Sequence, residues 1–239
     1  MRAGEPSPGA AGTLVSLVFS PDGHLLAAGG NDKVIHLWDT TTPAHPRTLG
    51  ALTGPSEEIL SVAVSADGRT LAAGSAYRKV YLWNIADPAH VVPVATLVGP
   101  SQTVRAVAFT PDGHTLAAGG NDSTIHLWNV VDPAHPVLLG VLTGPTSKIF
   151  SMAVSPDDRH LAAGTGAEHS VYLWDISDPA HPIADGPPLT GPASWINSVA
   201  FSPDGVTLGS SDSLLGCSTS AHGSRSVTCP SPAQPGHHR

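Results

Sequence analysis

Residues 107–129 read VAFTPDGHTLAAGGNDSTIHLWN, and the unit that contains this stretch occurs four times in full along the 239-residue chain. Counted between their tryptophans, the copies are 45, 45 and 46 residues apart, at Trp38, Trp83, Trp128 and Trp174. A fifth copy begins with SVAFSPDG at residues 198–205 and loses the pattern after Leu208. A period in the mid-forties is typical of a protein built from stacked structural repeats.

Each copy predicts four short β-strands separated by turns. In the third copy the breaks fall at Pro111-Asp112-Gly113, at Asn121-Asp122 and at residues 132–136, which are rich in the residues that turns favour. The strands of this copy are expected at residues 104–109, 116–119, 124–130 and 137–142. No window has a sustained apolar spacing of 3.6 residues, so we expect no helices. A four-stranded sheet of this size cannot bury both faces alone, but stacked copies can.

The unit resembles the WD40 repeat, whose copies fold as the blades of a β-propeller. The resemblance rests on Ser-Pro-Asp-Gly between the first two strands, on Asp32 and Asp122 six residues before their tryptophans, and on Leu-Trp-Asp or Leu-Trp-Asn ending the third strand. It implies that these two acids and the four tryptophans are structural anchors of the repeat. The recurring Asp-Pro-Ala-His-Pro and Leu-Thr-Gly-Pro segments also resemble the high-copy WD40 arrays of actinobacterial proteins.

We therefore expect an all-β fold, a WD40-type β-propeller that is incomplete, with four four-stranded blades and half of a fifth. The blades are expected at residues 13–52, 58–98, 103–143 and 148–190, and a partial blade of two strands at 195–210. Residues 1–12 are expected to form a flexible lead-in, and residues 211–239, rich in Ser, Pro and Gly, a disordered tail. The open strand edges of such an array offer a route to self-association.

The copies depart from the family in the polar network inside each blade. In the family, a His after Gly, a Ser or Thr on the second strand, the turn Asp and the Trp share hydrogen bonds. Here Pro follows that Gly in four copies, Ala replaces the Ser or Thr, and Tyr77 replaces the Asp of the second copy. We expect the network to be absent, with no orphaned polar groups, and stability to rest on apolar packing.

Composition and charge argue against several classes of function. The formal net charge is −8, and the 11 Lys and Arg residues are scattered, so the basic patch that nucleic-acid binding needs is missing. No apolar run is long enough to span a membrane, and residues 14–19 are too short for the apolar part of a signal peptide. We expect a cytoplasmic protein.

We expect neither catalysis nor a bound metal or cofactor. One acid recurs in the first turn of each copy, at Asp22, Asp67, Asp112, Asp157 and Asp204, and one His recurs in the Asp-Pro-Ala-His segment. One residue per copy places the members of each series too far apart to share a site. The two cysteines, Cys217 and Cys229, lie in the tail with 11 residues between them, more than paired zinc ligands usually have. The sequence contains no nucleophile elbow, phosphate-binding loop or His-Glu-x-x-His motif.

Positions that differ between copies indicate where a partner binds. One such series lies at the start of the innermost strand, at Val15, Leu60, Arg105, Phe150 and Asn197. The resemblance implies that these positions open onto the top face near the central channel. Aromatic and Arg side chains are the usual anchors of protein interfaces. The predicted partner-binding residues are Leu60, Arg105, Phe150, Asn197, Tyr77 and Trp195.

The resemblance implies a non-catalytic scaffold for protein–protein interaction, acting through the top face. Two alternatives stay open. The chain is a truncated or frameshifted fragment of a larger WD40 signalling protein, without a function of its own, or it is a propeller that binds a small ligand or acts as an enzyme.

Overall fold

The computed structural model describes residues 12–213, 217–221 and 225–228, and these form five antiparallel sheets. The first sheet consists of β1 (Leu14–Phe19), β2 (Leu25–Gly30), β3 (Ile35–Asp39) and β4 (Arg47–Leu52). The second consists of β5 (Ile59–Val64), β6 (Thr70–Ser75), β7 (Lys79–Asn84) and β8 (Val92–Val98). The third consists of β9 (Val104–Phe109), β10 (Thr115–Gly120), β11 (Ile125–Asn129) and β12 (Val137–Leu142).

The last two sheets differ slightly from the first three. The fourth consists of β13 (Ile149–Val154), β14 (His160–Thr165), β15 (Ser170–Asp175) and two short strands, β16 (Ile183–Ala184) and β17 (Leu189–Thr190), which both pair with β15. The fifth consists of β18 (Ile196–Phe201), β19 (Thr207–Asp212), β20 (Cys217–Ala221) and β21 (Arg225–Thr228). No helix occurs in the described residues, so the prediction of an all-β chain is confirmed.

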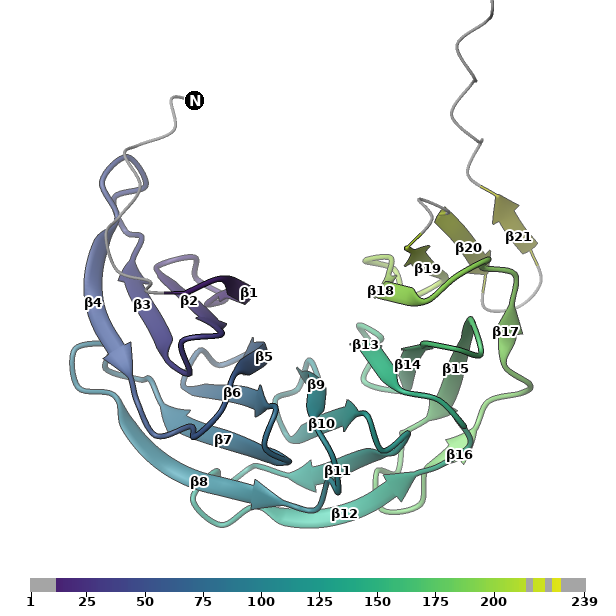
Figure 1. Cartoon of the computed structure of the whole chain (residues 1–239), viewed down its shortest axis with the longest axis horizontal. Coiled ribbons are helices and arrows are strands. Elements are labelled where there is room, and N and C mark those ends of the chain that lie inside the picture. Colours follow the sequence, from purple (N-terminus) through teal and green to yellow (C-terminus); the bar gives the residue numbers. More distant parts are fainter. Residues whose placement is uncertain (1–11, 214–216, 222–224, 229–239) are drawn as a thin grey trace, which may run out of the picture.

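The five sheets stand side by side in an arc (Figure 1). Strands β1, β5, β9, β13 and β18 line the inside of the arc, and each packs against the innermost strand of the next sheet. The first and fifth sheets flank a gap, so the ring is not closed, as predicted (Figure 1).

The fifth sheet has four strands where the sequence predicted two. Residues 217–221 pair with 207–211, and residues 225–228 pair with 218–221. The expectation of a tail that is disordered from residue 211 is therefore wrong for β20 and β21, and the rest of that tail after residue 213 lies outside the described residues. The repeat pattern is hard to see there because Ser, Thr and Ala replace the usual apolar residues, whereas the ladder is made by backbone groups.

Neighbouring sheets bury a continuous apolar layer between them. Ile35 and Leu37 of the first sheet belong to one buried cluster with Leu71 and Trp83 of the second, and similar clusters fill the other three interfaces. The Ala-Ala-Gly pattern of the second strands makes this close packing possible. A Cβ added at Gly74 would lie 2.7 Å from the Val104 Cγ1 atom of the next sheet, which is too close for a real contact.

The face of the first sheet that borders the gap exposes apolar side chains that are more buried at the equivalent places in the other sheets. Leu17 is 65% exposed, whereas Val62, at the equivalent place in the second sheet, is 7% exposed. Within the described residues, no other sheet stands beside this face of the first sheet (Figure 1). The apolar side chains of β1 are therefore left at the surface.

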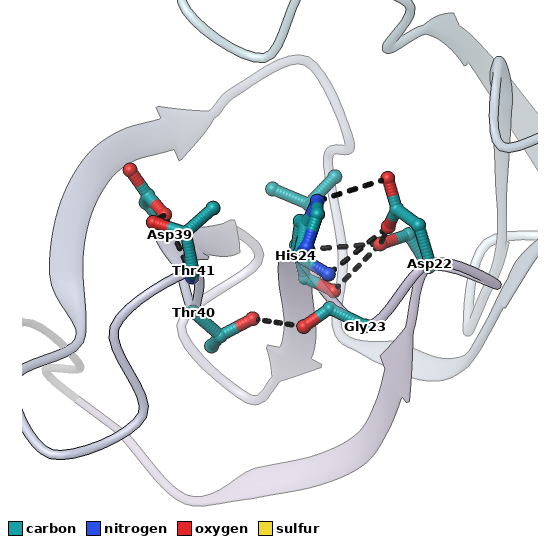
Figure 2. A network of polar contacts seen from close by, with 8 residues as sticks. Asp22, Gly23, His24, Asp39, Thr40 and Thr41 are labelled. Atoms are coloured by element: carbon teal, nitrogen blue, oxygen red, sulfur yellow. Dashed lines mark hydrogen bonds and ion pairs between the residues drawn. The ribbon is translucent and has the colours of Figure 1, made fainter.

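The turn after each innermost strand is held by a hydroxyl and a carboxylate. In the first sheet, Ser20 donates a hydrogen bond to the Asp22 carboxylate at 2.5 Å, and this carboxylate accepts the backbone N–H of His24 at 3.0 Å. Thr40 donates to the carbonyl of Gly23 at 2.6 Å (Figure 2). The Ser20 hydrogen bond is the main cause that lowers the pKa of Asp22. The equivalent pairs are Ser65–Asp67, Thr110–Asp112, Ser155–Asp157 and Ser202–Asp204.

A second set of hydrogen bonds joins neighbouring sheets. The Ser61 hydroxyl accepts the backbone N–H of Val107 at 3.1 Å, and Ser16 and Ser151 make the same bond at their own interfaces. Between the third and fourth sheets the equivalent residue is Ala106, which cannot make it. This interface has a different bond near its other end, from the N–H of Asp112 to the Asp158 carboxylate.

The turn acids Asp32 and Asp122 have polar partners, although Pro and Ala replace the His and the Ser or Thr of the family network. The Asp32 carboxylate lies 2.7 Å from His36 Nε2, with both side chains nearly buried, and the Asp122 carboxylate accepts the backbone N–H of Ser101 at 2.7 Å. Proline removes one N–H from each Gly-Pro loop, but the residue after it still has one to donate.

The four tryptophans that the resemblance marks as anchors are buried, with 3–8% of each exposed. Each stacks on the ring two residues before it: His36, Tyr81, His126 or Tyr172, at centroid distances of 5.5–5.9 Å. The expectation that no polar group is orphaned fails here, because Trp38 Nε1 and His126 Nδ1 are buried without a hydrogen-bond partner.

Candidate interaction surface

Every innermost strand contains a β-bulge at its second residue. In β9, for example, Val104 pairs with Gly120 and Ala106 with Gly119, so Arg105 is left out of the ladder. The bulged residues are Val15, Leu60, Arg105, Phe150 and Asn197, which is the series that the sequence indicated as variable. A bulge turns its side chain away from the sheet faces, so these five residues are free to differ without disturbing the packing between sheets.

The bulges lie at one end of the sheets, which we call the top face. It comprises the starts of the innermost strands and the turns between second and third strands, at residues 31–34, 76–78, 121–124, 166–169 and the end of β19.

Three of the predicted residues come together on the top face, one from each of three successive repeats. The Arg105 guanidinium lies over the Phe150 ring, with 4.8 Å between Cζ and the ring centroid. Phe150 also stacks on Trp195, with 5.5 Å between centroids and 18° between ring planes. Trp195 remains 52% exposed. Cation–π and stacked aromatic contacts each stabilise such an arrangement by about 0.5–1.5 kcal/mol.

These three side chains line a hollow of about 620 Å³, the top-face hollow. A volume of this size falls within the range of sites that bind small molecules or a few peptide side chains. The lining residues are Arg105, Asn121, Ser123, Thr146, Ser147, Lys148, Phe150, Gly166, Ala167 and Trp195.

Comparison with known protein families decides which fold family this architecture represents. The model of the WD40 repeat, described as the WD domain, G-beta repeat, matches residues 8–39, 46–84, 91–129, 136–175 and 187–217. The chain belongs to the WD40 family. Its five sheets are blades of an open WD40 propeller. No curated protein matches the chain.

The second to fifth matched WD40 units each straddle two sheets. The second match, residues 46–84, contains β4 of the first sheet and the first three strands of the second sheet. The fifth match ends at Cys217, the first residue of β20, and so extends the repeat beyond Leu208, where the sequence pattern faded.

Asn121 and Gly166 shape the hollow. The Asn121 side-chain oxygen accepts a hydrogen bond from Arg105 Nε at 2.5 Å and fixes the guanidinium. Gly166 occupies the equivalent turn position in the next repeat, and a Cβ there would lie 2.8 Å from Phe150 Cε2. The glycine therefore leaves the space into which the Phe150 ring turns.

The charge of the hollow is positive. Arg105 and Lys148 line it, and no carboxylate does. Burial lowers the pKa of Arg105, but a guanidinium remains charged at any physiological pH.

Glu168, the acid of the turn at residues 166–169, is already hydrogen-bonded, in part to the lining residue Thr146. Its carboxylate accepts hydrogen bonds from Thr146 and, at 2.5 Å, from the Tyr172 hydroxyl. Burial acts to raise the pKa of Glu168, but these hydrogen bonds outweigh it and hold the pKa below its usual range. Burial, followed by the bond to Glu168, raises the pKa of Tyr172 to about 12.

The other three predicted residues lie outside the hollow. Leu60 is half-buried at the bulge of β5. Asn197 is exposed and donates from Nδ2 to the Ser213 hydroxyl at 3.0 Å. Tyr77 is 56% exposed, with Lys79 Nζ 5.9 Å from its ring centroid.

The sequence did not single out most of the polar lining. Asn121 and Ser123 look like ordinary turn residues, and Thr146 and Ser147 follow a Gly-Pro that occurs four times along the chain. One difference between repeats does indicate this site. Gly166 stands where the first and third repeats have Asn, in the same repeat that carries Phe150.

The recurring histidines form separate pairs. His90, His135 and His181 each place Nδ1 within 2.7–2.9 Å of the Asp three residues before, with 83–84% of each His side chain exposed. In the part of the chain that the structure describes, no three His, Cys, Asp or Glu side chains are grouped to hold a metal ion. The same residues include no helix that is long and apolar enough to cross a membrane.

Proposed function

We propose that this WD40 chain is a non-catalytic, cytoplasmic scaffold that binds other proteins through the top-face hollow. One observation carries the proposal: Arg105, Phe150 and Trp195 form a continuous stack across three repeats. Two of these side chains occupy bulges, where the fold itself does not require an Arg or a Phe.

The chemistry of the stack supports a protein partner. Arg and aromatic residues carry most of the binding energy in protein interfaces, and an exposed Trp on a rigid base loses little conformational entropy when it is covered. The net charge of −8 disfavours a nucleic-acid partner, because phosphates would be repelled by most of the surface.

The test is to compare partner capture by three forms of the chain. We expect proteins that crosslink to the wild-type chain to be lost from the variant that combines Arg105→Ala and Phe150→Ala. Val15→Ala is the matched control, because Val15 occupies the bulge of the first sheet, far from the hollow in sequence and outside its lining.

Thermal unfolding of each variant shows that the comparison is made between folded proteins. Retention of the same partners by the double variant contradicts the proposal. Loss of the partners from the Val15→Ala control also contradicts it, since the binding site would then include the first sheet.

A further inference from the structure

The top-face hollow has a charge opposite to that of the chain as a whole. The chain has a formal net charge of −8, but the hollow contains two cations and no acid. In the described residues, the ion pairs of Lys and Arg with carboxylates are Lys33–Glu57 and Arg47–Asp39. Arg105 and Lys148 therefore have no carboxylate partner of their own within that part of the chain, and both are available to an anion from outside.

One edge of the Arg105 guanidinium already has a hydrogen-bond partner, which orients the group. Its Nε donates to Asn121, and one face lies on the Phe150 ring. Arg has five N–H donors in a planar fork, and the four on the terminal nitrogens have no partner among the described residues. These terminal nitrogens have the geometry that binds both oxygens of one carboxylate.

Apolar surface and a spare hydroxyl lie beside this cationic group. Trp195, 52% exposed, continues the stack that begins at Arg105, and so presents an apolar ring next to the charge. The Ser147 hydroxyl is buried in the wall of the hollow without a hydrogen-bond partner.

We propose that the top-face hollow binds an acidic peptide segment of a partner protein, in which an Asp or Glu side chain lies next to an apolar residue. The carboxylate is bound by the terminal nitrogens of Arg105 with Lys148 beside them, and the apolar side chain covers Trp195. This inference rests on the proposed function and adds the chemistry of the partner to it.

The experiment is an array of seven-residue peptides probed with the full labelled chain. The central residue is Asp, Glu, Asn, Gln, Lys or phosphoserine, and its neighbour is Ala, Leu, Phe or Trp. We expect Asp and Glu peptides with an apolar neighbour to bind at least about tenfold more tightly than their Asn and Gln counterparts, because a hydrogen-bonded charge is lost in the amides. Arg105→Gln should remove this preference, whereas Lys79→Gln, a cation outside the hollow, should keep it.

Phe150→Ala separates failure of this inference from failure of the proposed function. If amide, Lys or phosphoserine peptides bind best and this binding needs Phe150, the hollow is a peptide site but not one for carboxylates. If no peptide signal depends on Phe150, the hollow is not an interaction site, and the proposed function fails with the inference.

Discussion

Asp158 accepts a hydrogen bond from the backbone N–H of Asp112 at 2.8 Å and thereby joins the first turns of the third and fourth sheets. In the other four repeats the position of Asp158 is a glycine with φ near +70°, and Asp158 itself has φ of 62°. A non-glycine residue pays for this backbone conformation with roughly 1 kcal/mol of strain. The bond to Asp112 offsets that strain, at the one interface that lacks the serine hydrogen bond.

This balance predicts different outcomes for two substitutions at Asp158. Asp158→Ala keeps the strain and loses the bond, so we expect it to lower the free energy of unfolding by about 1–2 kcal/mol. Asp158→Gly loses the bond but also relieves the strain, so its stability should stay within about 1 kcal/mol of the wild type. Urea denaturation measures both. Equal stability of the Ala variant and the wild type would show that the bond does not hold this interface.

Ala106→Ser should add the missing hydrogen bond between the third and fourth sheets. Ala106 is 6% exposed and aligns with Ser16, Ser61 and Ser151, each of which accepts an N–H from the next sheet. By this alignment the new hydroxyl should accept the N–H of Met152 and raise the free energy of unfolding by about 0.5–1.5 kcal/mol.

Ser61→Ala is the reciprocal test and should cost a similar amount. Both variants are measured by urea denaturation. A destabilised Ala106→Ser would mean that the hydroxyl is buried without a partner, and that the interface is arranged differently from the other three.

The repeat pattern was sufficient to predict most of the fold. In the third repeat, the four expected strands agree with β9–β12 to within one residue at each end. Turn residues and alternating apolar residues act locally, so the sequence contains nearly all the information that determines these elements. The last two strands of the fifth sheet were missed because their residues are small and polar and the strands are held by backbone pairing, which leaves little pattern in the side chains.

The candidate site was only partly predictable, and the reason is geometric. Arg105, Phe150 and Trp195 stand out because they are large and differ from their counterparts in other repeats. The distance between sheets and the bulges determine which of the variable residues are in contact. Neither can be predicted from single positions. Asn121 and Gly166 were missed for the same reason, since each matters only through a neighbour from another strand or repeat.

His126 should make the stability of the wild-type chain sensitive to mild acid. Burial lowers the pKa of His126 from about 6.5, although Asp122 opposes the shift. The folded state disfavours the charged ring, so His126 contributes to the free energy of unfolding above its unfolded pKa of about 6.5. This contribution is lost as the pH falls from that value through the lower pKa of the folded state.

Tyr is the natural replacement for this histidine, since Tyr81 and Tyr172 occupy the same position and stack on their tryptophans in the same way. Between about pH 7.5 and about pH 5.5, which bracket the ordinary pKa of His, we expect His126→Tyr to lose less stability than the wild type. Thermal unfolding at both pH values measures the difference. An equal loss of stability in the wild type and the variant would contradict the prediction.

Phe150→Ala should expose Trp195 without unfolding the chain. The other four tryptophans are 3–8% exposed, whereas Trp195 is 52% exposed and has one face covered by Phe150. A quencher such as acrylamide therefore reports mainly on Trp195. We expect faster quenching in the variant and a loss of stability of no more than about 1–2 kcal/mol, because Phe150 is only half-buried and the stack itself contributes about 0.5–1.5 kcal/mol.

Gly166→Ala tests the same stack from the other side. The added Cβ would lie 2.8 Å from Phe150 Cε2, so the ring has to turn away from its contacts with Arg105 and Trp195. Acrylamide quenching of Gly166→Ala should rise towards that of Phe150→Ala. Adding Trp195→Phe to either variant should remove the fluorescence that acrylamide quenches readily. Wild-type quenching in Gly166→Ala would mean that Phe150 does not rest against Gly166 in solution, and the hollow would then lack the rigid base on which its proposed binding depends.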